Sequence, residues 1–186
     1  MMDDHKIIEL FFARSEQAIS ELDKKYGQTC RRLSGNILNN PQDAEECVND
    51  AYLGTWNAIP PEHPNPLLAF LCKIVRNLSV MRYHANTAMR RNSAYDVALE
   101  ELENTLVSPA SVENEVDAKL LAGLIETFLD ALSEENRVIF MRRYWYSDTY
   151  AEIAERVGLN KKTVSVRLTR ARKQLREYLI EKEALT

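Results

Sequence analysis

The stretch LNKKTVSVRLTRARKQLREYL, residues 159–179, decides the fold of the C-terminal part of the chain. Its apolar residues recur at the spacing of one helix face: Val164, Leu168, Ala171 and Leu175. Lys161 and Lys162 stand in the first turn, where the helix end already carries partial positive charge. Cations gathered at that end indicate that an anion binds there.

The segment SDTYAEIAERVG, residues 147–158, comes directly before this helix. We expect Ser147 or Asp148 to cap a short helix that turns Ile153, Ala154 and Val157 inward. Gly158 can then take a positive φ and reverse the chain. A small residue at the crossing, a glycine at the turn and a branched residue at Val164 predict a helix-turn-helix.

The outward face of the second helix combines long cations with hydroxyl side chains, a mixture that suits a DNA groove. It consists of Lys162, Ser165, Val166, Thr169, Arg170 and Lys173, flanked by Arg167 and Arg172. A basic helix can also be an ordinary solvated face of a bundle. The helix-turn-helix spacing favours DNA binding over that alternative.

Helical spacing continues through the rest of the chain, and no segment has the alternation of a strand. Helices are expected over residues 4–14, 15–38, 41–59 and 67–84, with Asn40 and Asn65 as caps before Pro41 and Pro66. The proline-rich segment 60–66 predicts a stiff loop. The fold class is therefore all-α, in two small helical domains with a C-terminal helix-turn-helix.

Charge is distributed in blocks, although the 186 residues sum to only −4. Residues 51–95 hold five Lys or Arg and one acid, whereas 96–117 hold seven acids and no Lys or Arg. Residues 160–186 hold eight Lys or Arg and three acids. Two basic blocks separated by an acidic one predict an acidic linker between two domains that bind anions. One helix near 93–104 is expected within this linker.

Several classes of function find no support in the sequence. Cys30, Cys47 and Cys72 lie far apart, and the three histidines match no zinc spacing, so we expect reduced thiols and no metal. Nucleotide-binding and nucleophile motifs are absent from the sequence, which gives no case for an enzyme or a cofactor. No secretion signal or membrane span is found, and a cytoplasmic protein is expected.

Two segments together resemble the extracytoplasmic-function (ECF) group of sigma-70 family RNA polymerase sigma factors. DAEECVNDAYLGTWNAI, followed by LLAFLCKIVRNLSVMRYH, is similar to sigma region 2. LSEENRVIFMRRYWYSDTYAEIAERVGLNKKTVSVRLTRARKQL is similar to sigma region 4. The resemblance divides the chain into region 2 at 1–90, an acidic linker at 91–111 and region 4 at 112–186.

The resemblance implies a factor that directs core RNA polymerase to a subset of promoters. Region 2 would bind the β′ coiled coil through an acidic face with one leucine: Glu45, Glu46, Asn49, Asp50 and Leu53. It would recognise and melt the minus-10 element through Trp56, Phe70, Lys73, Arg76, Asn77 and Arg82. Phe70 and Trp56 also fit a purely structural place in the core. The prolines of loop 60–66 depart from the family loop that captures a flipped base.

Region 4 would hold the minus-35 element and the β flap. The base-facing residues would be Ser165, Val166, Thr169 and Arg170, and the phosphate contacts Lys161, Lys162, Thr163, Arg167, Arg172 and Lys173. Ile139, Phe140, Tyr144 and Trp145 are candidates for the flap or for the core. The acidic linker would thread toward the RNA exit channel or act as a solubilising tether, and an anti-sigma factor is expected as a further partner.

Two other classes of protein remain open at this point. A helix-turn-helix regulator outside the sigma family would carry a ligand or receiver domain at its N-terminus, and a receiver would need strands. A helical adaptor would bind no DNA, whereas a factor with several phosphate contacts would lose DNA affinity steeply as salt rises.

Overall fold

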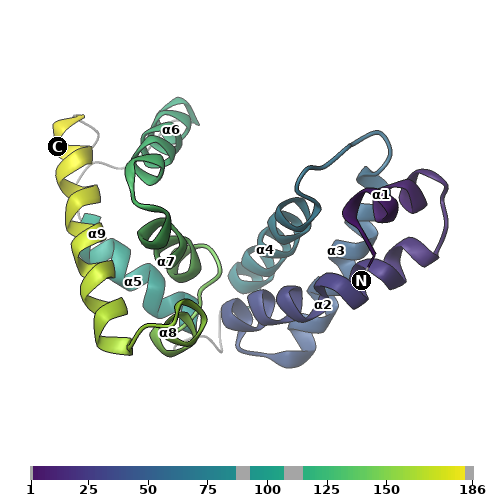
Figure 1. The fold of residues 1–186 in the computed structure, drawn as a ribbon, viewed down its shortest axis with the longest axis horizontal. Coiled ribbons are helices and arrows are strands. Elements are labelled where there is room, and N and C mark those ends of the chain that lie inside the picture. Colours follow the sequence, from purple (N-terminus) through teal and green to yellow (C-terminus); the bar gives the residue numbers. More distant parts are fainter. Residues whose placement is uncertain (1, 87–92, 107–114, 183–186) are drawn as a thin grey trace. The chain divides into compact units, whose positions relative to one another are not determined.

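The computed structural model describes residues 2–86, 93–106 and 115–182. Within these ranges the chain forms helices α1 to α9 and no strand, which confirms the all-α prediction (Figure 1). The chain divides into two compact units, Met1–Ala94 and Tyr95–Thr186. None of the helices in the described ranges is long and apolar enough to cross a membrane.

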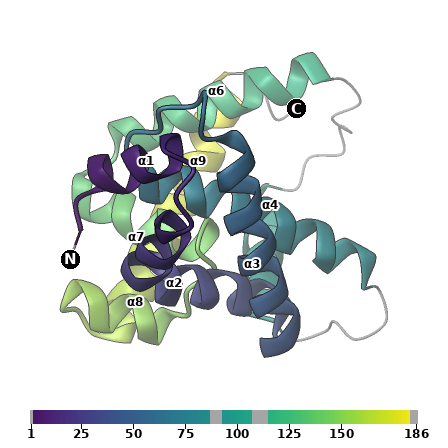
Figure 2. The same cartoon turned by 90° about the vertical axis from the view of Figure 1, so that its right-hand side faces the viewer.

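Unit 1 consists of α1 (Asp4–Phe12), α2 (Gln17–Leu38), α3 (Pro41–Ala58) and α4 (Leu67–Ala85). Helices α2, α3 and α4 pack against one another, and α1 packs against α2 (Figures 1 and 2). The apolar stripes expected from the sequence supply the core, which includes Leu22, Leu33, Ile37, Val48, Leu71 and Val75. A buried hydrogen bond of 2.8 Å between the hydroxyls of Ser34 and Ser79 joins α2 to α4 inside this core.

The helix ends of unit 1 follow local chemistry, with one difference from the prediction. Asn40 caps α3 by accepting from the amides of Gln42 and Asp43, and Pro41 opens the helix, as expected. At α4, by contrast, Pro66 itself occupies the capping position and no side chain caps the helix. Asn65 is therefore not the cap, because Pro66 is extended (ψ 145°) and the helix begins one residue later, at Leu67.

Helix α1 is fastened to α2 by one carboxylate. Asp4 accepts hydrogen bonds of 2.6 Å from the amine of Lys25 and of 2.6 Å from the hydroxyl of Tyr26. Lys25 also donates to the backbone oxygen of Met2 at 2.8 Å. Ile7 and Phe11, fully buried, complete the apolar face of α1. The helical conformation is interrupted between α1 and α2 at Arg14, which has a φ of 53°.

Unit 2 contains α5 (Ala94–Leu106, which begins at the boundary), α6 (Glu115–Ala131), α7 (Glu134–Tyr144), α8 (Tyr150–Val157) and α9 (Lys161–Glu181). Ser133 caps α7 by accepting from the amide of Asn136. The helices from α6 through α9 share one core, which includes Phe128, Ile139, Phe140, Ile153, Val164, Leu168 and Leu175. Ile139 and Phe140, candidates for the flap or for the core, are buried in this core.

Helix α5 lies inside the segment predicted as an acidic linker. Its residues Leu102 and Leu106 pack against the core of unit 2, and Ala98 on the same face is 3% exposed. Residues 91–92 and 107–111 of the predicted linker lie outside the described residues. The division at 1–90, 91–111 and 112–186 stays a prediction, within which α5 packs with unit 2.

Candidate nucleic-acid interface

The turn between α8 and α9 is built from a capping box and a glycine. Thr149 accepts from the amide of Glu152, and the Glu152 carboxylate accepts from the amide of Thr149 at 2.7 Å. The expectation that Ser147 or Asp148 caps α8 is therefore wrong. Asp148 is instead fully buried and accepts a hydrogen bond of 2.9 Å from Arg142. Gly158 ends α8 with a φ of 67°, a conformation that costs a residue with a Cβ about 1 kcal/mol.

Helix α9 is held against α8 by the residues that were predicted from the helical spacing. Val164 and Leu168 are fully buried, and Ala154 of α8 is 7% exposed beneath them. Asn160 caps α9 by accepting from the amide of Thr163 at 2.8 Å and from its hydroxyl at 2.9 Å. The predicted helix-turn-helix is thus formed, with the N-terminus of α9 at the surface.

The outward face of α9 is a continuous exposed stripe. Val166, Thr169, Arg170 and Lys173 follow the three- and four-residue spacing of one helix face, and all four are exposed. Ser165 beside them is half-buried. Lys161 and Lys162 are exposed at the first turn, and Thr163 is half-buried. The structure therefore brings together, on one helix, the residues that the sequence predicted to face bases and most of the residues predicted to hold phosphates.

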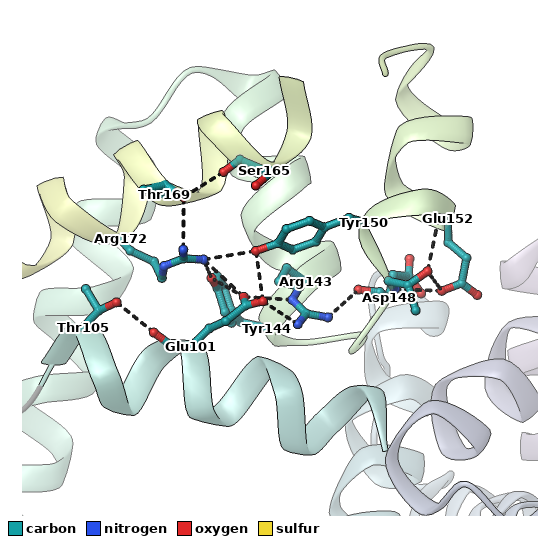
Figure 3. Close-up of polar contacts among 11 residues, drawn as sticks. Glu101, Thr105, Arg143, Tyr144, Asp148, Tyr150, Glu152, Ser165, Thr169 and Arg172 are labelled. Atoms are coloured by element: carbon teal, nitrogen blue, oxygen red, sulfur yellow. Dashed lines mark hydrogen bonds and ion pairs between the residues drawn. The ribbon is translucent and has the colours of Figure 1, made fainter. Parts of the chain in front are cut away.

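Two of the predicted phosphate contacts are engaged within unit 2. The guanidinium of Arg167 pairs with Glu135 of α7 at 2.5 Å. Arg172 has a side chain only 13% exposed and donates to Glu101 of α5 at 3.2 Å and to the hydroxyl of Tyr144 at 2.7 Å (Figure 3). Their phosphate contacts stay predictions, and in this arrangement both arginines fix α9 to its neighbours.

Sequence reasoning missed Glu101, because it stood among seven acids of a segment read as linker. One signal could have found it. Ala98, Leu102 and Leu106 recur every four residues, which marks a buried helix face with Glu101 beside it. Asp148 was missed for a different reason, because its position fitted a helix cap as well as it fits a buried ion pair.

On unit 1, the exposed face of α4 carries Lys73 and Asn77 one helical turn apart. Arg76 and Phe70 are half-buried at its edge. Arg82 is directed to α3, where it pairs with Asp43 at 3.4 Å and with Glu46 at 3.0 Å. Of the three basic residues predicted for the minus-10 element, Lys73 is thus exposed, whereas Arg76 and Arg82 lie closer to the helix bundle.

The outer face of α3 carries the acidic residues and the leucine predicted to bind core polymerase. Glu45, Glu46, Asn49, Asp50 and Leu53 are all exposed, and Leu53 is 58% exposed. Glu45 pairs with Arg31 of α2 at 2.8 Å. A groove of about 700 Å³ between α2 and α3 adjoins this face and is lined in part by Ile19, Asp23, Tyr52, Leu53 and Trp56.

Trp56, predicted for the minus-10 element, lies in this groove and against α1. Its ring meets Phe11 edge-on, with centroids 6.1 Å apart, and Arg14 lies 5.4 Å from the ring centroid. Arg14 also donates to the backbone oxygen of Trp56 at 2.7 Å. The structure therefore places Trp56 beside Leu53, on the side of unit 1 predicted to meet polymerase.

Both halves of the chain match families of known proteins. Residues 22–89 match the family described as Sigma-70 region 2, and residues 122–175 match the family described as Sigma-70, region 4. The ECF RNA polymerase sigma factor SigK of Mycobacterium ulcerans is 26% identical over 160 residues, 83% of each chain. SigL of Mycobacterium tuberculosis, also an ECF sigma factor, is 28% identical over 81% of this chain and 80% of its own.

Two further likenesses cover almost the whole chain. The ECF RNA polymerase sigma factor SigE of Mycolicibacterium smegmatis is 24% identical over 95% of this chain and 69% of its own. The solved structure of CnrH in complex with the cytosolic domain of CnrY aligns over 96% of this chain and 97% of that chain, with a TM-score of 0.45 and 20% identity.

The two family matches correspond to the two units of the structure. The region 2 match runs from α2 to the end of α4, and the region 4 match runs from α6 into α9. A regulator outside the sigma family and a helical adaptor would not account for both regions in this order. The chain therefore belongs to the sigma-70 family and is an RNA polymerase sigma factor of the ECF group, which acts in the initiation of transcription.

Proposed function

We propose that α9 reads the minus-35 promoter element from the major groove with Val166, Thr169 and Arg170, with Ser165 at the edge of the contact. The observation that carries this proposal is the exposed stripe on α9, which follows directly from the helix-turn-helix turn at Gly158. Arg170 is its central residue, because an arginine can bind guanine through two hydrogen bonds and discriminates by roughly 1–3 kcal/mol.

Phosphates would be held at both ends of this stripe. Lys161 and Lys162, exposed in the first turn of α9, combine with the partial positive charge of the helix end to attract a phosphate. Lys173 extends the positive face toward the C-terminus of the helix, and the hydroxyl of Thr163 would donate to a phosphate only after leaving Asn160. Arg167 and Arg172 would reach phosphates only after leaving Glu135 and Glu101, respectively.

The minus-10 element would lie along α4 of unit 1. Lys73 and Asn77 are exposed in consecutive turns, so the lysine can hold the DNA backbone while the amide of Asn77 reads or supports a base. Arg76 and Phe70 border this pair, and a half-buried ring can offer one face for stacking on a base. Arg82 supports α4 through its ion pairs with α3.

Core RNA polymerase would bind the acidic face of α3 and the groove beside it. The face offers carboxylates to a basic helical partner, such as the β′ coiled coil, and Leu53 offers an exposed apolar anchor. The groove lined by Leu53 and Trp56 can receive an apolar side chain of that partner. The β flap is a second expected contact, through unit 2, and an anti-sigma factor remains an expectation drawn from the family. A factor that acts on core polymerase would work in the cytoplasm.

The proposal is tested by the base preference at the minus-35 element. The full chain would be combined with sigma-free core polymerase and a promoter library randomised in that element, and the transcribed sequences would be counted. Arg170→Ala is expected to remove the preference at one position and to lower transcription about 5- to 150-fold. The matched control is Arg176→Ala, an exposed arginine of the same helix. An equal effect of both variants, spread over all positions, would contradict base reading by Arg170.

A further inference from the structure

Helix α5 is packed as a structural part of unit 2. Leu102 and Leu106 lie one turn apart and pack against the core that α6 to α9 share, and Ala98, one turn earlier on the same face, is buried. Such a stripe buries one side of a helix against its neighbours, whereas a tether would be polar all round. The segment that the charge pattern presented as a linker is therefore docked beside the recognition helix.

One carboxylate on the docked face connects α5 to three other helices. Glu101 accepts two parallel hydrogen bonds from Arg143 of α7, at 2.8 Å and 3.1 Å, which is the two-pronged geometry of a strong guanidinium pair. It also accepts from the hydroxyls of Tyr144 at 3.2 Å and of Tyr150, the first residue of α8, at 2.9 Å. Arg172 of α9 donates to it at 3.2 Å (Figure 3).

The surroundings make this carboxylate hard to replace. Arg143 is 3% exposed, and a buried guanidinium requires a nearby anion. Burial raises the pKa of the Tyr144 hydroxyl and that of the Tyr150 hydroxyl, so both keep their protons and can donate to Glu101. The donors therefore converge on a single carboxylate.

The connection continues from Glu101 to the DNA-facing surface of α9. While Nη1 of Arg172 donates to Glu101, Nη2 donates to the hydroxyl of Thr169 at 3.1 Å. The hydroxyl of Thr169 in turn donates to the backbone oxygen of Ser165 at 2.9 Å. Because its proton is used within the helix, Thr169 can offer DNA only a methyl group and one acceptor position.

We propose that Glu101 is a positioning residue for promoter recognition. It acts through Arg172 to fix the side chain of Thr169, and the fixed hydroxyl determines which base this threonine can contact. The inference rests on the proposed function of α9. A threonine that cannot donate suits the methyl group of thymine or the amino group of adenine or cytosine. It disfavours guanine, which presents only acceptors in the major groove.

The test compares variants of the full chain with sigma-free core polymerase on the library randomised in the minus-35 element. Glu101→Gln keeps the shape of the side chain and removes its charge, which releases Arg172 and the hydroxyl of Thr169. It is expected to relax the exclusion of guanine at one position on the order of fivefold. Glu103→Gln, an exposed acid of the same helix, is the control and is expected to leave every preference unchanged.

A double variant separates positioning from a general loss of structure. Thr169→Val removes the hydroxyl and keeps the branched shape, so Glu101→Gln is expected to cause no further change at that position in this background. Arg172→Gln cuts the same connection but leaves the pair of Glu101 with Arg143, and it is expected to relax the same position. It keeps the inference testable if Glu101→Gln fails to fold.

Two results would overturn the inference while the proposed function stands. One is a uniform fall in transcription with all base preferences unchanged, for Glu101→Gln or for Arg172→Gln. The other is an equal effect of Glu101→Gln with and without the hydroxyl of Thr169. If the unaltered protein selects no minus-35 sequence at all, the proposed function fails first, and the inference fails with it.

Discussion

At the scale of single residues, charged side chains in both units hold structural elements together, a role that their sequence positions did not indicate. Asp4 holds α1 on α2 through Lys25 and Tyr26, and Asp148 is buried against Arg142. Burial alone would raise the pKa of Asp4, but the hydrogen bonds from Lys25 and Tyr26 outweigh it, and its pKa lies below the ordinary value of 3.8. A carboxylate of this kind contributes to stability only while it is ionised.

The first prediction concerns the pH dependence of this contact. Because the pKa of Asp4 is lower in the folded than in the unfolded chain, its contribution is complete above pH 3.8 and is lost as the pH falls through the lower folded value. Asp4→Asn is therefore expected to lower the free energy of unfolding of unit 1 at neutral pH, by an amount that shrinks below pH 3.8. Urea unfolding of both proteins across this range measures the difference.

The control for this prediction is Asp3→Asn, which changes the neighbouring exposed carboxylate. It is expected to have little effect at any pH. A difference between wild type and Asp4→Asn that stays constant down to the acid limit would show that Asp4 acts through its shape and not through its charge.

At the scale of elements, the turn at Gly158 sets how α9 leaves α8. A Cβ at this glycine would meet nothing within 4 Å, so a substitution acts through the backbone and not through a clash. Gly158→Ala is expected to destabilise unit 2 by about 1 kcal/mol, because alanine is strained at a φ of 67°. Thermal unfolding measures this loss.

Gly123 in the middle of α6 is the matched control, since a Cβ there also meets nothing within 4 Å. Gly123→Ala should have the opposite sign and stabilise the helix by roughly 0.5–1 kcal/mol. If both alanines stabilise unit 2, the positive φ of Gly158 does not constrain the turn.

A further prediction at this scale concerns the outer face of α3. Leu53 is 58% exposed, so Leu53→Asp should fold normally and yet weaken binding to core polymerase on the order of tenfold, by placing a charge where an apolar anchor is proposed. Equilibrium binding of labelled protein to sigma-free core polymerase provides the measurement. Leu120→Asp changes a leucine of α6 that is 64% exposed and serves as the control. Equal weakening by both variants would remove α3 from the proposed interface.

Most elements could be predicted from the sequence because their signals are local. The cap at Asn40, the proline at Pro41 and the apolar stripes act within a few residues, and the structure has helices where they indicated them. The prediction of a cap at Asn65 was wrong because two neighbouring signals competed for one position, and Pro66 occupies the capping position. The docking of α5 could not be predicted, because Glu101 contacts residues that lie 42 to 71 positions away along the chain. A charge pattern does not indicate which residues so far apart in sequence come into contact.

The residues of the candidate site likewise divide into those that local spacing could predict and those that depend on contacts from distant parts of the chain. The outward face of α9 follows from helical spacing, which places Val166, Thr169 and Arg170 on one exposed stripe. The inward engagement of Arg167 and Arg172 depends on acids from α7 and α5, so spacing along α9 could not separate these arginines from exposed ones. The position of Trp56 depends likewise on α1, which approaches it from far along the sequence.

At the scale of the whole molecule, a net charge of −4 hides a chain that carries its positive charge where DNA is proposed to bind. The binding of the polymerase complex to a promoter fragment should therefore weaken as salt rises, with a slope set by the number of phosphates neutralised. Lys162→Ala is expected to weaken binding to all promoters alike and to reduce this slope by about 1. Lys119→Ala, an exposed lysine of α6, is the control. An unchanged slope for Lys162→Ala would exclude a phosphate contact by Lys162.

The central claim is that this chain directs polymerase to particular promoters through the exposed face of α9. The most direct test adds the purified protein to sigma-free bacterial core polymerase, transcribes fragmented genomic DNA and maps the 5′ ends of the RNA. Discrete start sites that share an upstream motif, and whose use falls about 5- to 150-fold with Arg170→Ala but stays unchanged with Arg176→Ala, are the predicted result. Start sites no different from those of core polymerase alone, or start sites used equally by the unaltered protein and by Arg170→Ala, would contradict the account.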